Sequence, residues 1–496
     1  MRATAVLVAA AAATAAAAAA KTECDPGQYY HDRGSYDCGS DCCPCQAGFF
    51  CPGSEAVSGE EPCPPGMTSL PSSSSETACT GPIAEVSQVH VAYTGVAGQL
   101  SVDFVALSEG PAFAFTSVNQ AAWTATPVAS TLYVSTIGHL HQALLTWPGV
   151  KPGQTVFYKV GNAGANSSVF SVTPIVDHPE TFVVYGDFGA ANDACLDSLI
   201  KDSQAGLFDT VLHVGDWAYN FETANSSVGN VFMQLTQAYS AVKPTMPVEG
   251  NHEVCGTCPS VANAPITAGN FSEYQARFHS VALFAGANAG SGSARYYSFN
   301  QGLVHFLVFS AEAYAYKSGA QFIANQLAFM KADLLKVDRA ATPWVVALVH
   351  KTFWMEPEAY ADFSPVLQDG GVDVLFCGHV HYYNRLYPYD PVADKIDTAS
   401  VSADGTTYTD PKYVVDIITG APGDREDTST YVKEAYSYTG SSNYGYGSFQ
   451  AVNATTLTWS YKSIRASGTG PADYADTLHI VQTKHGLRNG GAALRA

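Results

Sequence analysis

The sequence has little positive charge. Lysine and arginine together number 24 of 496 residues against 44 aspartates and glutamates, so the formal net charge is −20 at pH 7. This balance argues against nucleic-acid binding, because phosphate backbones are held mainly by lysine and arginine. It does not exclude a small phosphate ester held at one local site by metal ions. Charged residues make up only 14% of the chain, whereas 47% are apolar and 12% aromatic, which excludes a disordered chain.

Long hydrophobic runs are absent after the first twenty residues. No later segment approaches the ~18 consecutive apolar residues of a membrane helix, and the C-terminal end lacks a GPI tail and an ER-retention tetrapeptide. The chain starts with Arg2 and an alanine-rich run from Ala3 to Ala20, which predicts a cleaved secretory signal over residues 1–20. We therefore expect a secreted protein (extracellular, cell-wall or vacuolar) without a membrane span.

Secretion gives meaning to four Asn-X-Ser/Thr triplets, which occur often by chance in any sequence. In a secreted chain they are acceptor sites for N-glycans. The four asparagines are Asn166, Asn225, Asn270 and Asn453.

Cysteine is scarce in most of the chain and concentrated near its start. Eight of the twelve cysteines fall between Cys24 and Cys79, in a segment poor in aliphatic residues. In a secreted chain such an even set predicts a small disulfide-rich module with a linker over residues 21–80. Zinc binding by the same thiols is the weaker alternative. Cys45–Gly53 and Cys63–Gly66 resemble cysteine-rich repeats of extracellular receptors, which implies adhesion or spacing rather than chemistry.

Residues 81–177 alternate short β-rich runs with turn residues. Examples are Val89–Tyr93, Leu100–Val105 and Thr155–Val160. Short strands at regular spacing with no helical stretch predict a β-sandwich. No catalytic constellation occurs in this segment, so we expect it to be structural.

From Thr181 the pattern changes to apolar runs of strand length with helix-like stretches between them, of which Gln321–Lys336 is the clearest. This alternation predicts a buried sheet in a layered α/β domain over residues 178–486, followed by a tail, 487–496. Ligands of such domains gather at the carboxyl ends of strands. The expected strands are Phe182–Tyr185, Val211–Val214, Pro247–Val248, Val345–Val349 and Val374–Cys377.

Each of these strands is followed by a residue with an oxygen or imidazole ligand atom. The strand ends read Gly186-Asp187-Phe188-Gly189, Gly215-Asp216-Trp217-Ala218-Tyr219, Gly250-Asn251-His252-Glu253, His350, and Gly378-His379-Val380-His381. Mixed Asp, Asn and His ligands suit iron, zinc and manganese, and the adjacent glycines let backbone and metal approach closely. Two metals about 3.5–4 Å apart need one shared carboxylate and separate ligands on each side. One such motif alone is commonly a turn, but five in order predict a binuclear metal centre.

The ordered set resembles the binuclear metallophosphoesterases and, among them, the purple acid phosphatases. Two positions carry the narrower resemblance: Gly189, where the wider superfamily has histidine, and Tyr219, which ends the second motif. The resemblance covers roughly residues 82–485 and includes Tyr444–Gly447 and Leu457–Trp459. It implies a layered β-sheet/α-helix metallophosphoesterase domain preceded by a fibronectin-III-like β-sandwich.

The resemblance also implies an activity, that of an acid phosphatase that hydrolyses phosphate monoesters by attack of a metal-bound hydroxide. It implies ferric iron, Fe(3+), and a divalent metal (Zn, Mn or Fe), with the ligands Asp187, Tyr219 and His381 on the ferric side, Asn251, His350 and His379 on the divalent side, and Asp216 bridging them. A phenolate favours ferric iron over divalent ions, and a strongly polarised water is a nucleophile even in acid. His252, protonated in acid, is expected to contact the phosphoryl oxygen or the leaving group.

One departure from the family pattern follows His350. Plant-type members are expected to carry further histidines there, which bind substrate and protonate the leaving group, whereas residues 351–360 contain none. Three residues are alternatives for this role: Lys351, Glu356 and the more distant His279.

Two other functions stay open at this stage. A phosphodiesterase or nucleotidase of the same superfamily would be separated from a monoesterase by assays on both kinds of ester. A non-catalytic surface-binding protein would be expected to lack one or more metal ligands, and none is lost here. Small phosphorylated compounds are the expected substrates, and the sequence specifies neither the divalent metal nor the oligomeric state.

Overall fold

The computed structural model describes residues 85–495 except 108–109, 133–137, 163–164, 190–193, 224–225, 256–270, 317–318, 424–427 and 466–473. Before residue 85 it describes two short antiparallel pairs, β1 (Gln28–Tyr30) with β2 (Cys42–Pro44) and β3 (Phe49–Phe50) with β4 (Glu61–Pro62). The predicted signal and the disulfides of the N-terminal module lie outside the described residues. No helix in the described part of the chain is long and apolar enough to cross a membrane.

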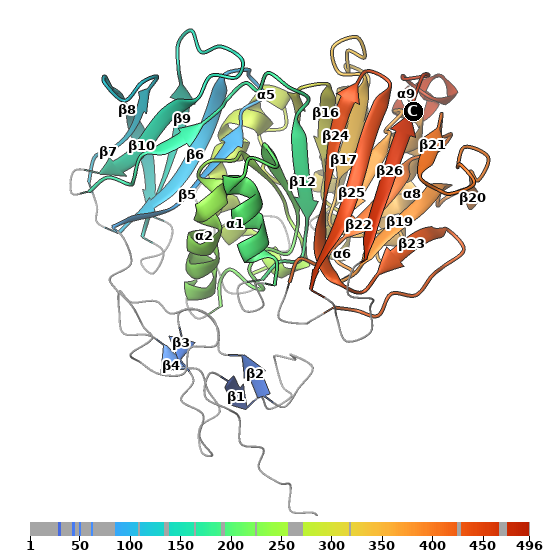
Figure 1. Ribbon diagram of the computed structural model, residues 1–496, viewed down its shortest axis with the longest axis horizontal. Helices are drawn as coiled ribbons and strands as arrows, with labels where there is room; N and C mark the ends of the chain where they lie inside the picture. Colours follow the sequence, from blue (N-terminus) through green and yellow to red (C-terminus); the bar gives the residue numbers. More distant parts are fainter. Residues whose placement is uncertain are drawn as a thin grey trace, which may run out of the picture.

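The first large unit consists of strands only, at one end of the molecule (Figure 1). Its strand order is β11-β10-β7-β8-β9-β6-β5, and β8 pairs with β7 over its first half and with β9 over its second half. The expected strands of this segment are confirmed within β5, β6 and β10. The strands are β5 (Val86–Tyr93), β6 (Gln99–Ala106), β7 (Ala112–Ser117), β8 (Thr124–Leu132), β9 (His139–Thr146), β10 (Val156–Asn162) and β11 (Phe170–Val172).

The rest of the chain contains two further sheets. The first has the order β14-β13-β12-β24-β25-β26-β21, with bounds β12 (Thr181–Tyr185), β13 (Thr210–Val214), β14 (Thr245–Val248), β21 (Thr407–Thr409), β24 (Tyr444–Asn453), β25 (Thr456–Arg465) and β26 (Ala475–Val481). The second has the order β15-β16-β17-β18-β22-β19-β20, and β23 pairs with β19. Its bounds are β15 (Tyr297–Gln301), β16 (Val304–Val308), β17 (Trp344–Leu348), β18 (Val374–Cys377), β19 (Tyr383–Asp390), β20 (Lys395–Ile396), β22 (Val415–Thr419) and β23 (Ser437–Ser441).

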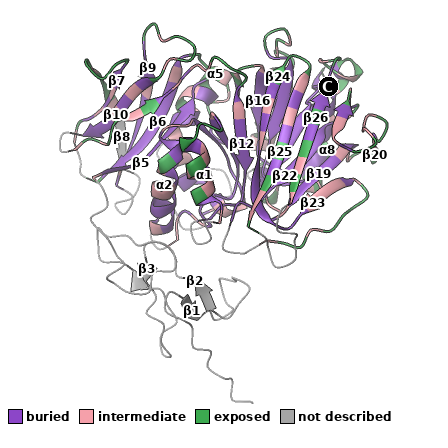
Figure 2. Ribbon diagram, viewed as in Figure 1, coloured by how far each residue is buried: buried purple, intermediate pink, exposed green. Residues whose placement is uncertain are grey.

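The two sheets share one apolar core. The ring centroids of Phe182 on β12 and Phe306 on β16 are 4.9 Å apart, and those of Phe376 on β18 and Phe449 on β24 are 5.3 Å apart. Every residue of β13, β17, β18 and β22 is buried (Figure 2). Burial on both faces explains why these strands appear in the sequence as continuous apolar runs rather than as alternating ones.

Helices α1 and α2 lie on the β12 side of the first sheet, toward the all-β unit (Figure 1), and helices α7 and α8 pack against the second sheet. The side chains of β25 and β26 alternate between buried and more exposed positions along most of each strand. The helix expected over Gln321–Lys336 is confirmed as α7, whose buried residues Gln326, Met330 and Leu334 recur every four positions and face the second sheet. The helices are α1 (Leu196–Gln204), α2 (Ser227–Ser240), α3 (Ser272–Arg277), α4 (His279–Val281), α5 (Ala287–Ala289), α6 (Glu312–Ala315), α7 (Ala320–Leu334), α8 (Pro357–Asp369) and α9 (Ala492–Arg495).

The last residues, which the sequence suggested as a tail, are packed against the domain. Helix α9 contacts α7 and α8, and Leu494 is buried in the core beneath those helices. The Asp369 carboxylate at the end of α8 accepts hydrogen bonds from Asn489 Nδ2, at 2.8 Å, and from the backbone N–H of Ala493, at 2.7 Å. The domain therefore includes these residues.

A buried arginine joins the all-β unit to the α/β unit. Arg277, at the end of α3, donates to Glu273 Oε1 at 2.7 Å, to Gln88 Oε1 on β5 at 2.6 Å and to Asn230 Oδ1 on α2 at 3.1 Å. Arg277 and Glu273 each have a side chain that is 1% exposed. One guanidinium thus connects three elements that are distant in sequence.

We expect Arg277→Met to destabilise the protein, because it leaves the carboxylate of Glu273 buried without its cation. Breaking a buried ion pair from one side typically costs about 3–5 kcal/mol in the free energy of unfolding. Urea unfolding monitored by tryptophan fluorescence measures this loss. Glu273→Gln added to Arg277→Met should recover part of it, and Arg495→Met at the exposed end of α9 should change little. A loss below about 1 kcal/mol would contradict the role given to this pair.

Candidate metal centre

The predicted ligand residues all follow strands at one edge of the paired sheets. Strands β12, β13 and β14 run parallel to one another, as do β17 and β18, so their carboxyl ends lie on the same side. The strands expected before each ligand motif are confirmed: Asp187 follows β12, Asp216 follows β13, Asn251 follows β14, His350 follows β17 and His379 follows β18.

Three of the candidates, those assigned to the ferric side, form one group. Tyr219 Oη lies 2.9 Å from His381 Nε2 and 3.3 Å from Asp187 Oδ1. His381 Nε2 lies 3.5 Å from the same Asp187 oxygen. A phenol, an imidazole and a carboxylate therefore direct their ligand atoms at one point.

The other four candidates form a second group around His350. Its Nε2 lies 3.0 Å from Asp216 Oδ2 and 3.1 Å from Asn251 Oδ1. Ligand atoms of Asp216, His350 and His379 all lie within 4.8 Å of one another. The structure thus brings the seven candidates to one edge of the sheets in two groups, with Asp216 in the group around His350.

A backbone carbonyl on the side away from the other ligands sets the orientation of the His350 ring. Its Nδ1 lies 2.8 Å from the carbonyl oxygen of Val214, and a carbonyl only accepts, so Nδ1 carries a proton and Nε2 faces the site. Burial would lower the pKa of His350, but Asp216 and Asp187 raise it to about 10. The oxygens around Nε2 therefore favour a positive charge, which a metal ion would supply. The residues around His350 Nε2 therefore fit a bound cation.

Four of the seven candidates have a backbone conformation that side chains seldom adopt. The φ angles of Asp187, Asp216, Tyr219 and His379 are 62°, 50°, 51° and 68°. Positive φ is uncommon for residues other than glycine and persists where the surrounding structure imposes it. These turns direct the side chains of strand-end residues sideways into a common site.

Glu253 is a functional residue that sequence reasoning missed. Its carboxylate accepts the backbone N–H groups of Asp216 at 3.0 Å, Trp217 at 2.9 Å and Gly250 at 2.7 Å. It therefore holds the loop after β13 against the loop after β14. The sequence did offer a signal, since Glu253 closes the motif that contains Asn251 and His252, but nothing in the pattern distinguished it from a solvent-exposed acid.

His252 lies beside both groups but is not one of the converging ligands. Its backbone N–H donates to Asp216 Oδ1 at 2.8 Å, and its Nδ1 lies 2.7 Å from Asn220 Oδ1. The ring packs against that of Tyr219, with centroids 4.3 Å apart. This placement is compatible with the expected contact to a substrate rather than to a metal.

The three alternatives for the absent histidines have different locations. Lys351 and Glu356 are close together, with Lys351 Nζ 3.7 Å from Glu356 Oε2. His279 instead begins α4, a helix that contacts β5, β6 and β9 of the all-β unit. This location argues against His279 as part of the site.

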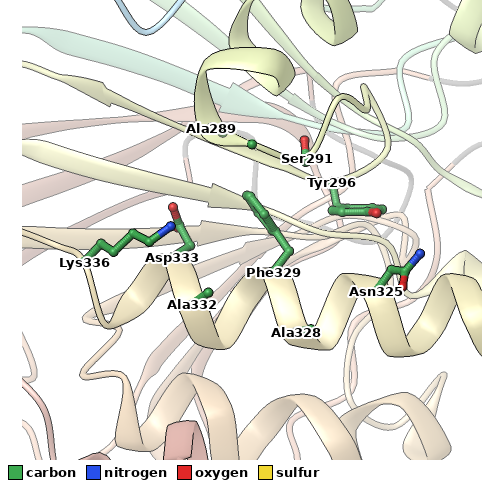
Figure 3. A pocket seen from close by; sticks show the side chains of 10 residues that line it. Ala289, Ser291, Tyr296, Asn325, Ala328, Phe329, Ala332, Asp333 and Lys336 are labelled. Carbon is green, nitrogen blue, oxygen red and sulfur yellow. The ribbon is translucent and has the colours of Figure 1, made fainter.

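A separate hollow lies between the end of α5 and helix α7 (Figure 3). Tyr296, Phe329, Asp333 and Lys336 are among the residues that line it. None of the predicted site residues is among the residues that line it, so this hollow is separate from the candidate metal centre.

Two known families match this chain in the part that forms the site. The family described as Calcineurin-like phosphoesterase matches residues 180–383, and the family described as Iron/zinc purple acid phosphatase-like protein C matches residues 413–470. The first range includes all seven candidate ligands, and the two ranges together include most strands of the two sheets but not β19, β20, β21 and β26. Residues 180–383 therefore match the class of the calcineurin-like phosphoesterases.

Curated relatives give a narrower class of similar proteins, and a solved structure has a similar fold. The chain is 29% identical over 381 residues to acid phosphatase type 7 of Danio rerio, covering 70% of this chain and 79% of the relative. It is 27% identical over 338 residues to purple acid phosphatase 18 of Arabidopsis thaliana, covering 65% and 68%. The fold is similar to that of purple acid phosphatase PPD1 from yellow lupin (Lupinus luteus) seeds, with a TM-score of 0.62 at 17% identity over 83% of this chain and 76% of that one. The predicted family is confirmed, and the chain is a purple acid phosphatase-like metallophosphoesterase.

The glycine at position 250 generates a prediction about metal retention. A Cβ added there would overlap Asp216 Oδ1, so Gly250→Ala should displace that carboxylate. Changes in residues that position metal ligands typically cost about 10–100-fold in metal affinity or activity. Metal analysis of the purified variant by mass spectrometry should show the loss, whereas Gly110→Ala, which meets no atom within 4 Å, should retain metal. Full metal content in Gly250→Ala would show that Asp216 is not a ligand.

Proposed function

We propose that this enzyme is an acid phosphatase that hydrolyses phosphate monoesters at a binuclear metal centre. The observation that carries the proposal is the convergence of Asp187, Tyr219 and His381 beside the group around His350. The family and the names of the relatives, acid phosphatase and purple acid phosphatase, support it. Phosphate release from a monoester and a diester, measured side by side on the purified protein, tests it. Preferential hydrolysis of the diester would favour the phosphodiesterase alternative.

The two groups differ in the metal that they suit. A tyrosine phenolate is a good ligand for ferric iron, so we assign Fe(3+) to Asp187, Tyr219 and His381. Asn251, His350 and His379 are neutral ligands that suit a divalent ion such as Zn, Mn or Fe, and we assign the role of shared ligand to Asp216. When bound, such metals supply Lewis acidity that activates water at acidic pH and neutralises phosphate charge.

The chain's own residues orient the reactants. The Val214 carbonyl fixes the His350 ring, and Glu253 fixes the backbone of Asp216 and Gly250, so the ligands need little reorganisation when substrate arrives. His252 is positioned by its backbone bond to Asp216 and its side-chain contact with Asn220. We assign to its ring the donation of a hydrogen bond to a phosphoryl oxygen or of a proton to the leaving group.

Several finer features belong to the same proposal. We infer a cleaved signal over 1–20, a disulfide-rich module over 21–80 and a fibronectin-III-like support over 81–177. The catalytic domain begins at residue 178 and, because α9 packs on it, extends past residue 486. Secretion would place N-glycans on the protein, and of the four triplets Asn166 and Asn453 lie at exposed positions of the described chain. Mass spectrometry of the mature N-terminus tests the signal. The change in mass of the protein on glycosidase treatment tests the glycans.

Tyr219→Phe tests the ferric assignment. A phenolate on ferric iron gives a ligand-to-metal charge-transfer band, so the protein isolated with iron is expected to be coloured. The variant retains the buried ring but loses its oxygen, so the visible band should disappear and iron retention should weaken. A visible spectrum and iron analysis of both proteins measure this. An unchanged band in the variant would remove Tyr219 from the ligand set.

His252→Ala tests the substrate role. Proton transfer from a positioned side chain typically contributes about 10²–10⁴-fold, so kcat should fall within that range. Metal content should stay the same, because His252 is not among the ligands that the family resemblance implies and its Nδ1 contacts Asn220 Oδ1. Steady-state kinetics together with metal analysis measure both effects. A variant that binds only one metal would identify His252 as a ligand.

A further inference from the structure

A nearly buried lysine lies next to the divalent group. Lys351 follows His350 directly in the chain, and its side chain is only 9% exposed. Its Nζ lies 2.9 Å from Glu312 Oε2 and 3.7 Å from Glu356 Oε2, and 5.5 Å from the centre of the Tyr316 ring. The proposed mechanism gives none of these groups a role.

The two carboxylates that contact the ammonium differ in their exposure to solvent. Glu312, at the start of α6, has a side chain that is wholly buried, whereas that of Glu356, before α8, is 15% exposed. Lysine loses much side-chain freedom when it is buried, and a buried ion pair is commonly no more stabilising than an apolar pair of the same volume. Stability alone therefore does not account for an ammonium fixed at this position.

The ammonium also retains an unused donor. A lysine has three N–H donors, and within the described residues Glu312 and Glu356 are the partners of Lys351 Nζ. The charge of Lys351 acts on His379, and the charge of Glu312 acts on His350, which places the ion pair beside the candidate ligands. Carboxylates dominate this neighbourhood, and the whole chain carries a net charge of −20. A phosphate ester approaching the site would gain from one fixed cation.

We propose that Lys351 is an anion-binding residue of the active site, where its free N–H donates to an oxygen of the substrate phosphate and of product phosphate. Glu312 and Glu356 fix the position of the ammonium. The inference rests on the proposed phosphatase function, and it assigns to Lys351 the substrate-binding part of the role left open by the absent histidines.

Inhibition by inorganic phosphate tests the inference, with a chromogenic aryl phosphate as the substrate. In Lys351→Gln the inhibition constant for phosphate and the KM should rise about tenfold, as expected for loss of one hydrogen bond to a charged group, while kcat changes less. Lys351→Arg should restore part of the affinity. Metal content should stay the same in both variants. An unchanged inhibition constant in Lys351→Gln would overturn the inference.

Glu312→Gln separates substrate binding from a structural role. It removes the buried counter-charge but keeps a side-chain oxygen that accepts from the ammonium, and Glu356 is unchanged, so the ammonium keeps its position and phosphate affinity should not fall. Equal losses of affinity in Lys351→Gln and Glu312→Gln would mean that the ion pair acts only as a structural unit, and would overturn the inference. Lys462→Gln serves as the matched control, because that lysine pairs with Asp202 and lies on β25; its inhibition constant should equal that of wild type.

A double variant covers the case in which Lys351→Gln fails to fold. Lys351→Met with Glu312→Leu replaces the ion pair by apolar side chains and should fold, while phosphate inhibition weakens as in the single variant. Wild-type affinity in the double variant would also overturn the inference. The proposed function fails separately, if the wild-type protein releases no phosphate from any monoester.

Discussion

The hydrogen bonds of one buried carboxylate hold the candidate centre together. Glu253 accepts backbone N–H groups from the loop after β13 and from the loop after β14, so the spacing between Asp216 and Asn251 depends on it. Amides that bond to a carboxylate form stronger hydrogen bonds than neutral pairs do. The chain's own hydrogen bonds therefore fix these loops relative to each other, which is what a centre that must hold two ions at a defined separation requires.

Fixing these loops stores unfavourable energy at the ligand positions. Asp187, Asp216 and Tyr219 have positive φ, a conformation that costs about 1–3 kcal/mol per residue. Burial also favours the neutral acid at Asp187 and raises its pKa. Strain acts against all three residues, and burial disfavours the charge of Asp187, a cost that a cation facing this carboxylate would offset. The ligand positions are thus arranged for ion binding rather than for stability.

The strands and the ligand residues at their ends could be predicted because both depend on local pattern. A strand buried on both faces must be apolar throughout, so the ends of β12, β13, β17 and β18 stand out where polar residues begin. Glu253, Glu312 and the carbonyl of Val214 could not be predicted in the same way. Their roles depend on which loops are in contact in the folded chain. The residues next to an acid or a carbonyl in the sequence do not indicate such a contact. The location of His279 on the all-β side is likewise a result of packing that spacing along the chain does not encode.

Each ligand group takes residues from both sheets. In the first group, Asp187 and Tyr219 follow strands of the first sheet and His381 follows β18 of the second. In the second group, Asp216 follows β13 of the first sheet and His350 follows β17 of the second. The separation between ligands from different sheets is set by the core between them, where Phe182 packs on Phe306 and Phe376 on Phe449. Protein cores are close-packed and transmit volume changes, so the aromatic layer acts as a spacer for the metal ligands. The apolar residues that give the strands their buried faces therefore also determine the geometry of the site at the strand ends.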